Sequence, residues 1–184
     1  MVNDQDQDRA LLQRCRDGDP AAFTALVVRY QRTIYNAAYR VLGNAEDARD
    51  VAQIVFLRVA ERLDEYDPQY KFFSWIYRIA VNESLNCLRR NGREVPLDDG
   101  YDPPASESAD PEWQVSEAQQ SARIQRALMG LKAESRVVLT LRHFSGCSYR
   151  EIGGILDLDE KTVKSRLYEA RQLLRERLKN RHGT

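Results

Sequence analysis

A proline- and aspartate-rich stretch between residues 95 and 111 most constrains how this chain can fold. It holds few large apolar residues and four prolines: Pro96, Pro103, Pro104 and Pro111. Such a composition cannot bury a core and is typical of a linker. The 184-residue chain is long enough for two small domains. We therefore predict one domain over residues 1–94, an acidic linker over 95–116 and a second domain over 117–184.

The sequence on both sides of this linker has the periodicity of helices. From Ala21 to Leu42, apolar residues recur at steps of three and four. Gly43 is placed to end that helix, and Asn44 is placed to cap the next one. The helices predicted before the linker cover residues 21–42, 45–63 and 74–90, with a loop over 66–73. Two amphipathic helices and a final helix pair follow the linker, and no strand-like alternation is present. The predicted fold class is therefore all-α, with two small helical domains.

The overall composition is that of a soluble protein. The chain is 42% apolar and 30% charged, and no apolar run approaches the roughly 18 residues of a membrane span. The N-terminus is acidic and polar, unlike a secretory signal peptide. Its three cysteines and two histidines have neither metal-ligand spacing nor the arrangement of a disulfide framework. We therefore expect a cytoplasmic protein without a metal or other cofactor.

Charge is distributed unevenly along the chain, although the net charge is zero. Residues 1–95 carry 14 Lys or Arg against 14 Asp or Glu. Residues 96–120 carry none against seven, and residues 121–184 carry 14 against seven. A basic C-terminal module indicates a polyanionic partner, because each cation at a phosphate releases counterions. The alternative is a charged helix end that is only solvated.

Two helices near the C-terminus have the spacing of a helix-turn-helix. Ser148 and Glu151 form the ends of a capping box for a short first helix. A tight turn at Asp157–Asp159 follows, and Asp159 can cap a second helix that begins at Glu160. A short helix, a tight turn and a longer helix with a polar outer face are typical of DNA-binding proteins of this kind.

The second helix of this pair has two distinct faces. Its apolar stripe comprises Val163, Leu167, Ala170, Leu174 and Leu178. Its outer face presents Lys161, Lys164, Ser165, Tyr168, Gln172 and Arg175, flanked by Glu169 and Arg171. Lys and Arg can donate to guanine or hold phosphate, Glu can accept from cytosine, and an exposed Tyr can contact a thymine methyl group or a sugar. A surface helix with solvated charges is the alternative.

The predicted helix over residues 45–63 carries an acidic face that also contains Ile54 and Leu57. Apolar residues within an acidic face indicate a second packing surface. From the residues alone, that surface could meet another helix of the same domain or a partner protein.

An aromatic cluster with interleaved cations occupies the following loop and helix start: Tyr66, Tyr70, Lys71, Phe72, Phe73, Trp75, Tyr77 and Arg78. Rings beside cations suit single-stranded DNA, because unstacked bases can stack on the rings while the backbone meets positive charge. The alternative is that most rings belong to the core, which we expect for Trp75 and Tyr77. Because Tyr66, Tyr70 and Lys71 fall in a proline-containing loop, we expect them to be exposed.

Taken in order, these segments resemble the extracytoplasmic-function (ECF) group of bacterial sigma factors, in the sigma-70 superfamily. Residues 47–57 are similar to the segment that grips the coiled coil of the polymerase β′ subunit. This resemblance implies core-polymerase contacts by Asp47, Asp50, Gln53, Ile54 and Leu57. Residues 73–82 resemble the segment that opens and reads the −10 element, after a loop that captures a flipped base. The implied −10 residues are Tyr66, Tyr70, Lys71, Phe72, Phe73, Trp75, Arg78 and Asn82.

Residues 162–171 look like the −35 recognition helix of the same family. The implied −35 residues are Arg150, Thr162, Lys164, Ser165, Arg166, Tyr168, Glu169, Arg171 and Gln172. The chain departs from the family at Arg49 and Ile54, where acidic residues are usual, and at Glu169, where a basic residue or histidine is usual. The polymerase-facing surface is therefore less acidic than in relatives, and the −35 preference is expected to differ.

The resemblance also implies a set of partners. These are core RNA polymerase (through its β′ coiled coil and β flap), promoter DNA and an anti-sigma factor, with no small-molecule substrate and no catalysis. A membrane-bound anti-sigma factor would hold the protein at the inner membrane face. Two other functions fit the residues less well: a helix-turn-helix regulator that needs no polymerase, and a helical nucleic-acid enzyme, which would need a metal-binding cluster in a cleft.

Overall fold

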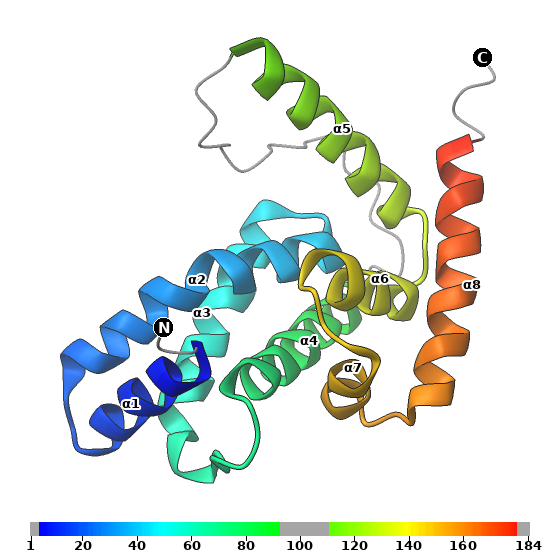
Figure 1. Ribbon diagram of the computed structural model, residues 1–184. Coiled ribbons are helices and arrows are strands. Elements are labelled where there is room, and N and C mark those ends of the chain that lie inside the picture. Colours follow the sequence, from blue (N-terminus) through cyan, green and yellow to red (C-terminus); the bar gives the residue numbers. More distant parts are fainter. Residues whose placement is uncertain (1–3, 93–110, 180–184) are drawn as a thin grey trace.

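The computed structural model describes residues 4–92 and 111–179, and these residues form helices and turns without a strand (Figure 1). The all-α prediction is confirmed. The elements before residue 92 are α1 (Asp4–Arg16), α2 (Pro20–Leu42), α3 (Ala45–Glu61), the 3₁₀ turn η1 (Leu63–Glu65) and α4 (Phe72–Arg90). The elements after residue 111 are α5 (Pro111–Met129), α6 (Ala133–Leu139), the π-helical turn η2 (Thr140–Phe144), α7 (Tyr149–Leu156) and α8 (Glu160–Lys179). The stretch of residues 95–110 that begins the predicted linker lies outside the described residues.

Local signals position the long helices of the first domain. The Asp19 side chain accepts from the N–H of Ala21 at the start of α2. Gly43 ends α2 with a φ of 75°, a conformation that glycine adopts without steric cost. The Asn44 side chain accepts from the N–H of Asp47 and so caps α3. The sequence prediction for this helix boundary is confirmed.

Helix α1 was not predicted from the sequence. It packs along α2 (Figure 1), and its Leu12 is buried in the core. The buried Asp8 accepts a hydrogen bond from the hydroxyl group of Tyr30 and lies 2.9 Å from Nε of Arg29. Few apolar residues reveal this helix in the sequence, because its stabilisation comes partly from this polar contact with α2.

Helix α4 begins at Phe72, two residues earlier than predicted. The Phe72 ring is buried and lies edge-on to Tyr30, with 5.3 Å between the ring centroids. Burial of this ring places the first turn of the helix against α2, and the predicted loop is correspondingly shorter.

The predicted helix-turn-helix comprises α7 and α8. The Ser148 and Glu151 side chains form both hydrogen bonds of the capping box at the start of α7. Asp157 ends α7 in the left-handed conformation, with a φ of 56°. Asp159 accepts from the N–H of Thr162 at 2.8 Å and caps α8. A Cβ atom at Gly153 would lie 2.6 Å from the carbonyl oxygen of Leu158, so a glycine is needed where the turn passes this close to α7.

The two domains contact each other. α6 and η2 pack against α2, and α7 packs against α4. In this interface Gln125 donates to the carbonyl of Tyr39 at 2.9 Å. The Arg40 guanidinium lies 3.6 Å from the centre of the Phe144 ring. Among the described residues, no helix is long and apolar enough to cross a membrane.

Candidate nucleic-acid and polymerase interfaces

The aromatic loop is built on a buried ring. Tyr66 is only 4% exposed, and its ring packs against Phe72 and Trp75 at centroid distances of 5.6 and 5.4 Å. Its hydroxyl group donates to the carbonyl of Tyr70 at 2.6 Å, and burial raises the pKa of that hydroxyl. The expectation that Tyr66 is exposed is therefore wrong, because its ring and its hydroxyl group are both used to fold the loop. Phe72 is likewise buried, so both residues support the predicted −10 surface from below.

Other members of the aromatic cluster remain accessible. Tyr70 is 68% exposed and Lys71 is exposed, as predicted. Trp75, which was expected in the core, is only half-buried. These three residues and Arg78 line a cavity of about 800 Å³ that ends against the start of α7. Rings and cations around one cavity are suited to a nucleobase with its phosphate.

The remaining predicted −10 residues lie along α4. Arg78 and Asn82 are both exposed and one helical turn apart. Phe73 is half-buried, with its ring 4.4 Å from that of Tyr77. Tyr77 is buried, as expected, and burial raises its pKa to about 12. The accessible −10 residues therefore run from the loop along one side of α4.

Arg16 is a contributor to this site that the sequence did not reveal. Its guanidinium donates to the carbonyl of Tyr66 at 2.7 Å and to that of Leu63 at 3.3 Å. It thus joins the end of α1 to the start of the aromatic loop. No sequence signal marks this contact, because both acceptors are backbone atoms.

The acidic face of α3 is accessible, as the predicted docking surface requires. Leu57 is 62% exposed, and Asp50 and Gln53 are exposed beside it. Ile54 is half-buried, and Asp47 is half-buried with its carboxylate oxygens 3.4 and 3.5 Å from the side-chain amide of Asn91. No other described helix covers Leu57, so the second packing surface is open to a partner.

Helix α8 has a buried face and an exposed face, as the sequence predicts. Val163, Leu167 and Ala170 are fully buried. The exposed predicted residues of this helix are Lys164, Ser165, Arg166, Tyr168 and Glu169, whereas the predicted Gln172 is half-buried. Tyr168 is 65% exposed, as a side chain that meets a partner must be.

Three predicted −35 residues are placed differently from the rest. The Thr162 hydroxyl group donates to Asp159 at 2.8 Å within the cap of α8. Nε of Arg171 donates to Nε2 of His143 at 3.1 Å, and the nearby charges of Arg171 and Arg142 add to burial in lowering the pKa of His143. Arg150 stands on α7 and lines the 800 Å³ cavity with Arg78.

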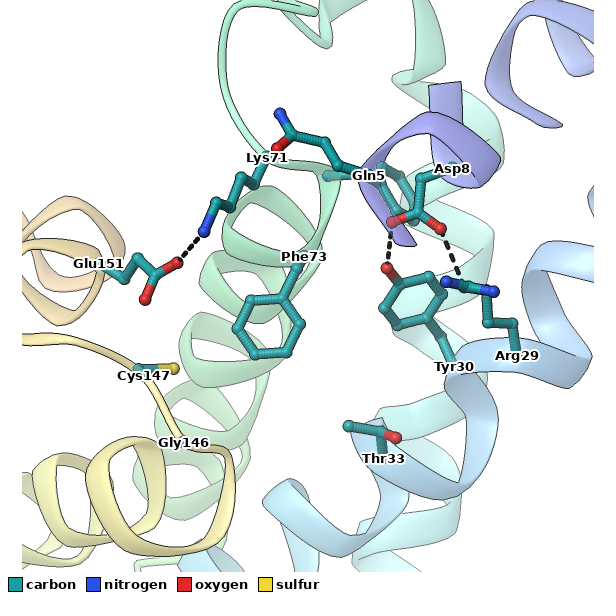
Figure 2. Close-up of a pocket in the computed structure, with 11 residues that line it drawn as sticks. Gln5, Asp8, Arg29, Tyr30, Thr33, Lys71, Phe73, Gly146, Cys147 and Glu151 are labelled. Atoms are coloured by element: carbon teal, nitrogen blue, oxygen red, sulfur yellow. Dashed lines mark hydrogen bonds and ion pairs between the residues drawn. The ribbon is translucent and has the colours of Figure 1, made fainter. Parts of the chain in front are cut away.

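An ion pair joins the two candidate DNA-binding regions. The Lys71 ammonium lies 2.7 Å from Oε1 of Glu151, and Figure 2 shows the two side chains reaching toward each other from α7 and the start of α4. Burial alone would raise the pKa of Glu151, but hydrogen bonds from Lys71 and Ser148 outweigh it and lower this pKa to about 2. Lys71, a predicted −10 residue, is thus paired with Glu151 of the helix-turn-helix. No group of three or more potential metal ligands occurs in the described part of the chain.

Two family models match the two domains. The model described as Sigma-70 region 2 matches residues 26–94. The model described as Sigma-70, region 4 matches residues 121–174. A helical domain with an aromatic loop and a helix-turn-helix domain thus define a protein with sigma-70 regions 2 and 4.

Similarity to known proteins extends over nearly the whole chain. The RNA polymerase sigma-H factor of Pseudomonas aeruginosa is 32% identical over 179 residues, covering 92% of this chain and 93% of the relative. The ECF RNA polymerase sigma factor SigW of Bacillus subtilis is 33% identical, covering 92% and 95%. The ECF RNA polymerase sigma-E factor of Escherichia coli is 32% identical, covering 94% and 95%. The chain belongs to the ECF RNA polymerase sigma factors.

Two solved structures have the same fold. CnrH, in complex with the cytosolic domain of CnrY, aligns with a TM-score of 0.70 and 26% identity, covering 95% of this chain and 99% of CnrH. The sigma factor RpoE from Bartonella quintana, in complex with the anti-sigma factor NepR, aligns with a TM-score of 0.69 and 24% identity, covering 85% and 96%.

Proposed function

We propose that this chain, as an alternative sigma factor, places core RNA polymerase on promoters through two separate DNA contacts. The aromatic loop and α4 would read and melt the −10 element, and α8 would read the −35 duplex. The observation that carries this proposal is the pairing of one ring-and-cation surface, suited to unstacked bases, with one polar helix face, suited to a major groove. A regulator that binds only duplex DNA has no need for the first surface.

Within the −10 surface, Tyr70 and Trp75 are the stacking residues, and Lys71 and Arg78 are the phosphate contacts. A flipped base costs a few kcal/mol of unstacking, which stacking on aromatic rings can offset. The 800 Å³ cavity beside these residues offers room for such a base.

Within the −35 surface, Lys164, Ser165 and Tyr168 are central. They are exposed and lie within four positions of one another on α8, so they can reach adjacent base pairs. Glu169 is placed to accept from a cytosine amino group and would set a preference that differs from that of relatives.

The exposed Leu57 and the acidic residues around it would bind the β′ coiled coil of core polymerase. An apolar residue surrounded by charges is a typical centre of a protein interface. The second domain would meet the β flap. The linker, with its excess of Asp and Glu, would lie in the polymerase channels where negative charge can replace that of RNA.

An anti-sigma factor is the proposed regulator. The support is that CnrH and RpoE, which share this fold, were solved with CnrY and the anti-sigma factor NepR. We infer that the anti-sigma factor competes for the polymerase-binding face of α3. If that factor is anchored in the membrane, it would keep this chain at the inner face.

The deciding experiment is in vitro transcription with purified core polymerase and a promoter library from the source genome. Promoter-specific transcripts that require the added chain are expected. Failure to start any specific transcript would refute the proposal.

Paired substitutions separate the two kinds of contact. Leu57→Asp should weaken core binding about tenfold or more, since it adds a charge to an exposed apolar contact, while leaving the preferred sequences unchanged. Glu169→Ala should change preference at one −35 position and leave core binding intact. Core binding is measured by fluorescence anisotropy and sequence preference by sequencing of selected promoters; loss of both properties in either variant contradicts the assignment.

A further inference from the structure

The π-helical turn η2 supplies side-chain contacts to cations of the recognition helix α8. In this turn the N–H of Ser145 donates to the carbonyl of Thr140, five positions earlier, at 3.0 Å. A π-helical turn holds one residue more than an α-helical turn and is frequent at functional sites. Two consecutive residues of η2, Arg142 and His143, take part in separate contacts that each end at a cation of α8.

His143 holds the first of these cations. Nε of Arg171 donates to Nε2 of His143 at 3.1 Å. Only a neutral imidazole can accept in this way, because a protonated ring has two donors and no acceptor. The surroundings favour the neutral form, since burial and the charges of Arg171 and Arg142 lower the pKa of His143. The described charged residues around the adjacent cavity of about 690 Å³ are all cations: Arg123, Arg171, Arg175 and Lys179.

Tyr149 contacts the second cation. Its ring is half-buried and packs against the core at the start of α7. The Arg142 guanidinium lies 5.0 Å from the ring centre, and the Lys164 ammonium lies 5.8 Å from it. Arg142 is itself anchored by a hydrogen bond of 2.8 Å to the carbonyl of Cys147. Because the face of an aromatic ring attracts cations, Tyr149 is a fixed support for Lys164.

Both supports are neutral. Within the described part of the chain, neither Lys164 nor Arg171 forms an ion pair with a carboxylate. A carboxylate would neutralise the cation and repel a phosphate. An imidazole or an aromatic ring restricts the position of a cation and leaves its charge available to a phosphate or a base edge. This combination suits a surface that binds DNA.

The two supported cations stand seven positions apart on α8. Seven residues of an α-helix span about 10.5 Å, close to the length of three base pairs at about 3.4 Å each. Residues 164, 168 and 171 share one face of the helix, so the exposed Tyr168 lies between the two cations. The supports therefore act at both ends of the segment assigned to the −35 element.

We propose that η2 is a positioning element for −35 recognition, in which His143 orients Arg171, and Arg142 together with Tyr149 orients Lys164. This inference rests on the proposed function and deepens it. It adds residues outside the recognition helix, which act on DNA through the cations they hold. Their loss would leave each cation more rotamers to give up on binding, and so would weaken the complex.

Nitrogen-15 NMR of the imidazoles tests the His143 contact in the whole chain without polymerase. His143 and His182 are the only histidines in the sequence, and His143→Gln assigns the two signals. Wild-type His143 should carry its proton on Nδ1 and should titrate below its ordinary value of 6.5. In Arg171→Gln the midpoint should rise, because a neighbouring positive charge is removed. A proton on Nε2, or an unchanged midpoint, would overturn the proposal.

Binding of promoter DNA by core polymerase that carries this chain measures the effect on recognition. His143→Ala and Tyr149→Leu should each weaken −35-dependent binding about two- to fivefold, as expected for loss of one exposed hydrogen bond or one cation–π contact. The matched variants His143→Gln, which keeps an acceptor, and Tyr149→Phe, which keeps the ring, should bind nearly as the wild type does. Leu173→Ala changes an exposed residue of α8 and is the control.

Double-mutant cycles separate positioning from stability. His143→Ala should weaken binding no further once Arg171→Ala is present, and Tyr149→Leu no further once Lys164→Ala is present. Additive losses, or equal losses in the truncated and the matched variants, would refute the inference alone. Absence of promoter-specific binding by the wild-type complex would refute the proposed function, and this inference with it.

Discussion

The two candidate DNA-binding surfaces differ in how they are built. In the first domain, aromatic rings of the candidate −10 surface pack against one another, and some of them belong to the core. In the second domain, the candidate −35 side chains lie on the face of α8 opposite its buried residues. Tyr70 and Trp75 are carried by Tyr66 and Phe72, which are buried. Tyr168 projects from the exposed face of α8, whereas Leu167 on the other face of this helix is buried in the core. Recognition and stability are therefore coupled in the first domain and separable in the second.

Phe72→Ala is the strongest test of the coupling. Truncation of a fully buried ring costs about 3–5 kcal/mol of unfolding free energy, and loss of −10 melting should accompany it. Tyr70→Ala is the control in the same loop, since an exposed ring should alter stability by no more than about 0.5 kcal/mol. Urea denaturation gives the free energies, and equal costs for the two variants would break the comparison.

Gly153→Ala tests the geometry beneath the recognition helix. Its Cβ would lie 2.6 Å from the Leu158 carbonyl oxygen, and relief of such a clash costs about 1–3 kcal/mol. Gly154→Ala is the neighbouring control, because its Cβ meets no atom within 4 Å and alanine favours a helix by about 1 kcal/mol. The midpoint temperature of thermal unfolding should fall for Gly153→Ala and rise for Gly154→Ala. A change in the same direction for both variants would contradict the described turn.

Tyr168→Ala should separate recognition from stability. The side chain is exposed, so the free energy of unfolding should change by no more than about 0.5 kcal/mol. Binding of the polymerase complex to −35 duplex should weaken by about 1 kcal/mol, the lower end for a base contact. A footprinting titration at fixed salt measures this, and a large stability loss would show that the second domain is coupled like the first.

The smallest expected effect is that of acid on the contact between the domains. The pKa of Glu151 falls from its ordinary value of 4.5 to about 2 in the folded chain. The stabilisation from the charged carboxylate is therefore complete above about pH 4.5 and is lost as the pH falls toward 2. The stability difference between wild type and Glu151→Gln should shrink over that range. A difference that grows with acid would contradict the role of the ion pair.

The sequence predicted most of the fold because its boundaries are marked by local chemistry. Gly43, Asn44, Ser148 and Asp159 each act on backbone groups within a few residues, and the structure has all four where the sequence placed them. Burial of a side chain by residues distant in the sequence has no such local signal. Tyr66 was expected to be exposed because it falls in a proline-containing loop, yet the rings of Phe72 and Trp75 pack against it and it is buried.

The candidate sites were predictable to a similar degree. The outer face of α8 follows from helical periodicity alone, so the exposure of Lys164, Ser165 and Tyr168 was expected. The Arg171–His143 hydrogen bond and the Lys71–Glu151 ion pair link residues 28 and 80 positions apart. The first of these contacts depends on how η2 and α8 pack within the second domain and the second on how the two domains pack, which no local pattern encodes.

The hydrogen bonds from Arg16 to the aromatic loop bear on how this protein can be divided. The region 2 match begins at residue 26, after the whole of α1. A chimera assembled from residues 26–94 would omit Arg16, the buried Leu12 and the Asp8–Tyr30 contact. Its loop would lose two anchoring hydrogen bonds although every residue of the matched region was retained. The transferable unit of this recognition module therefore starts at α1.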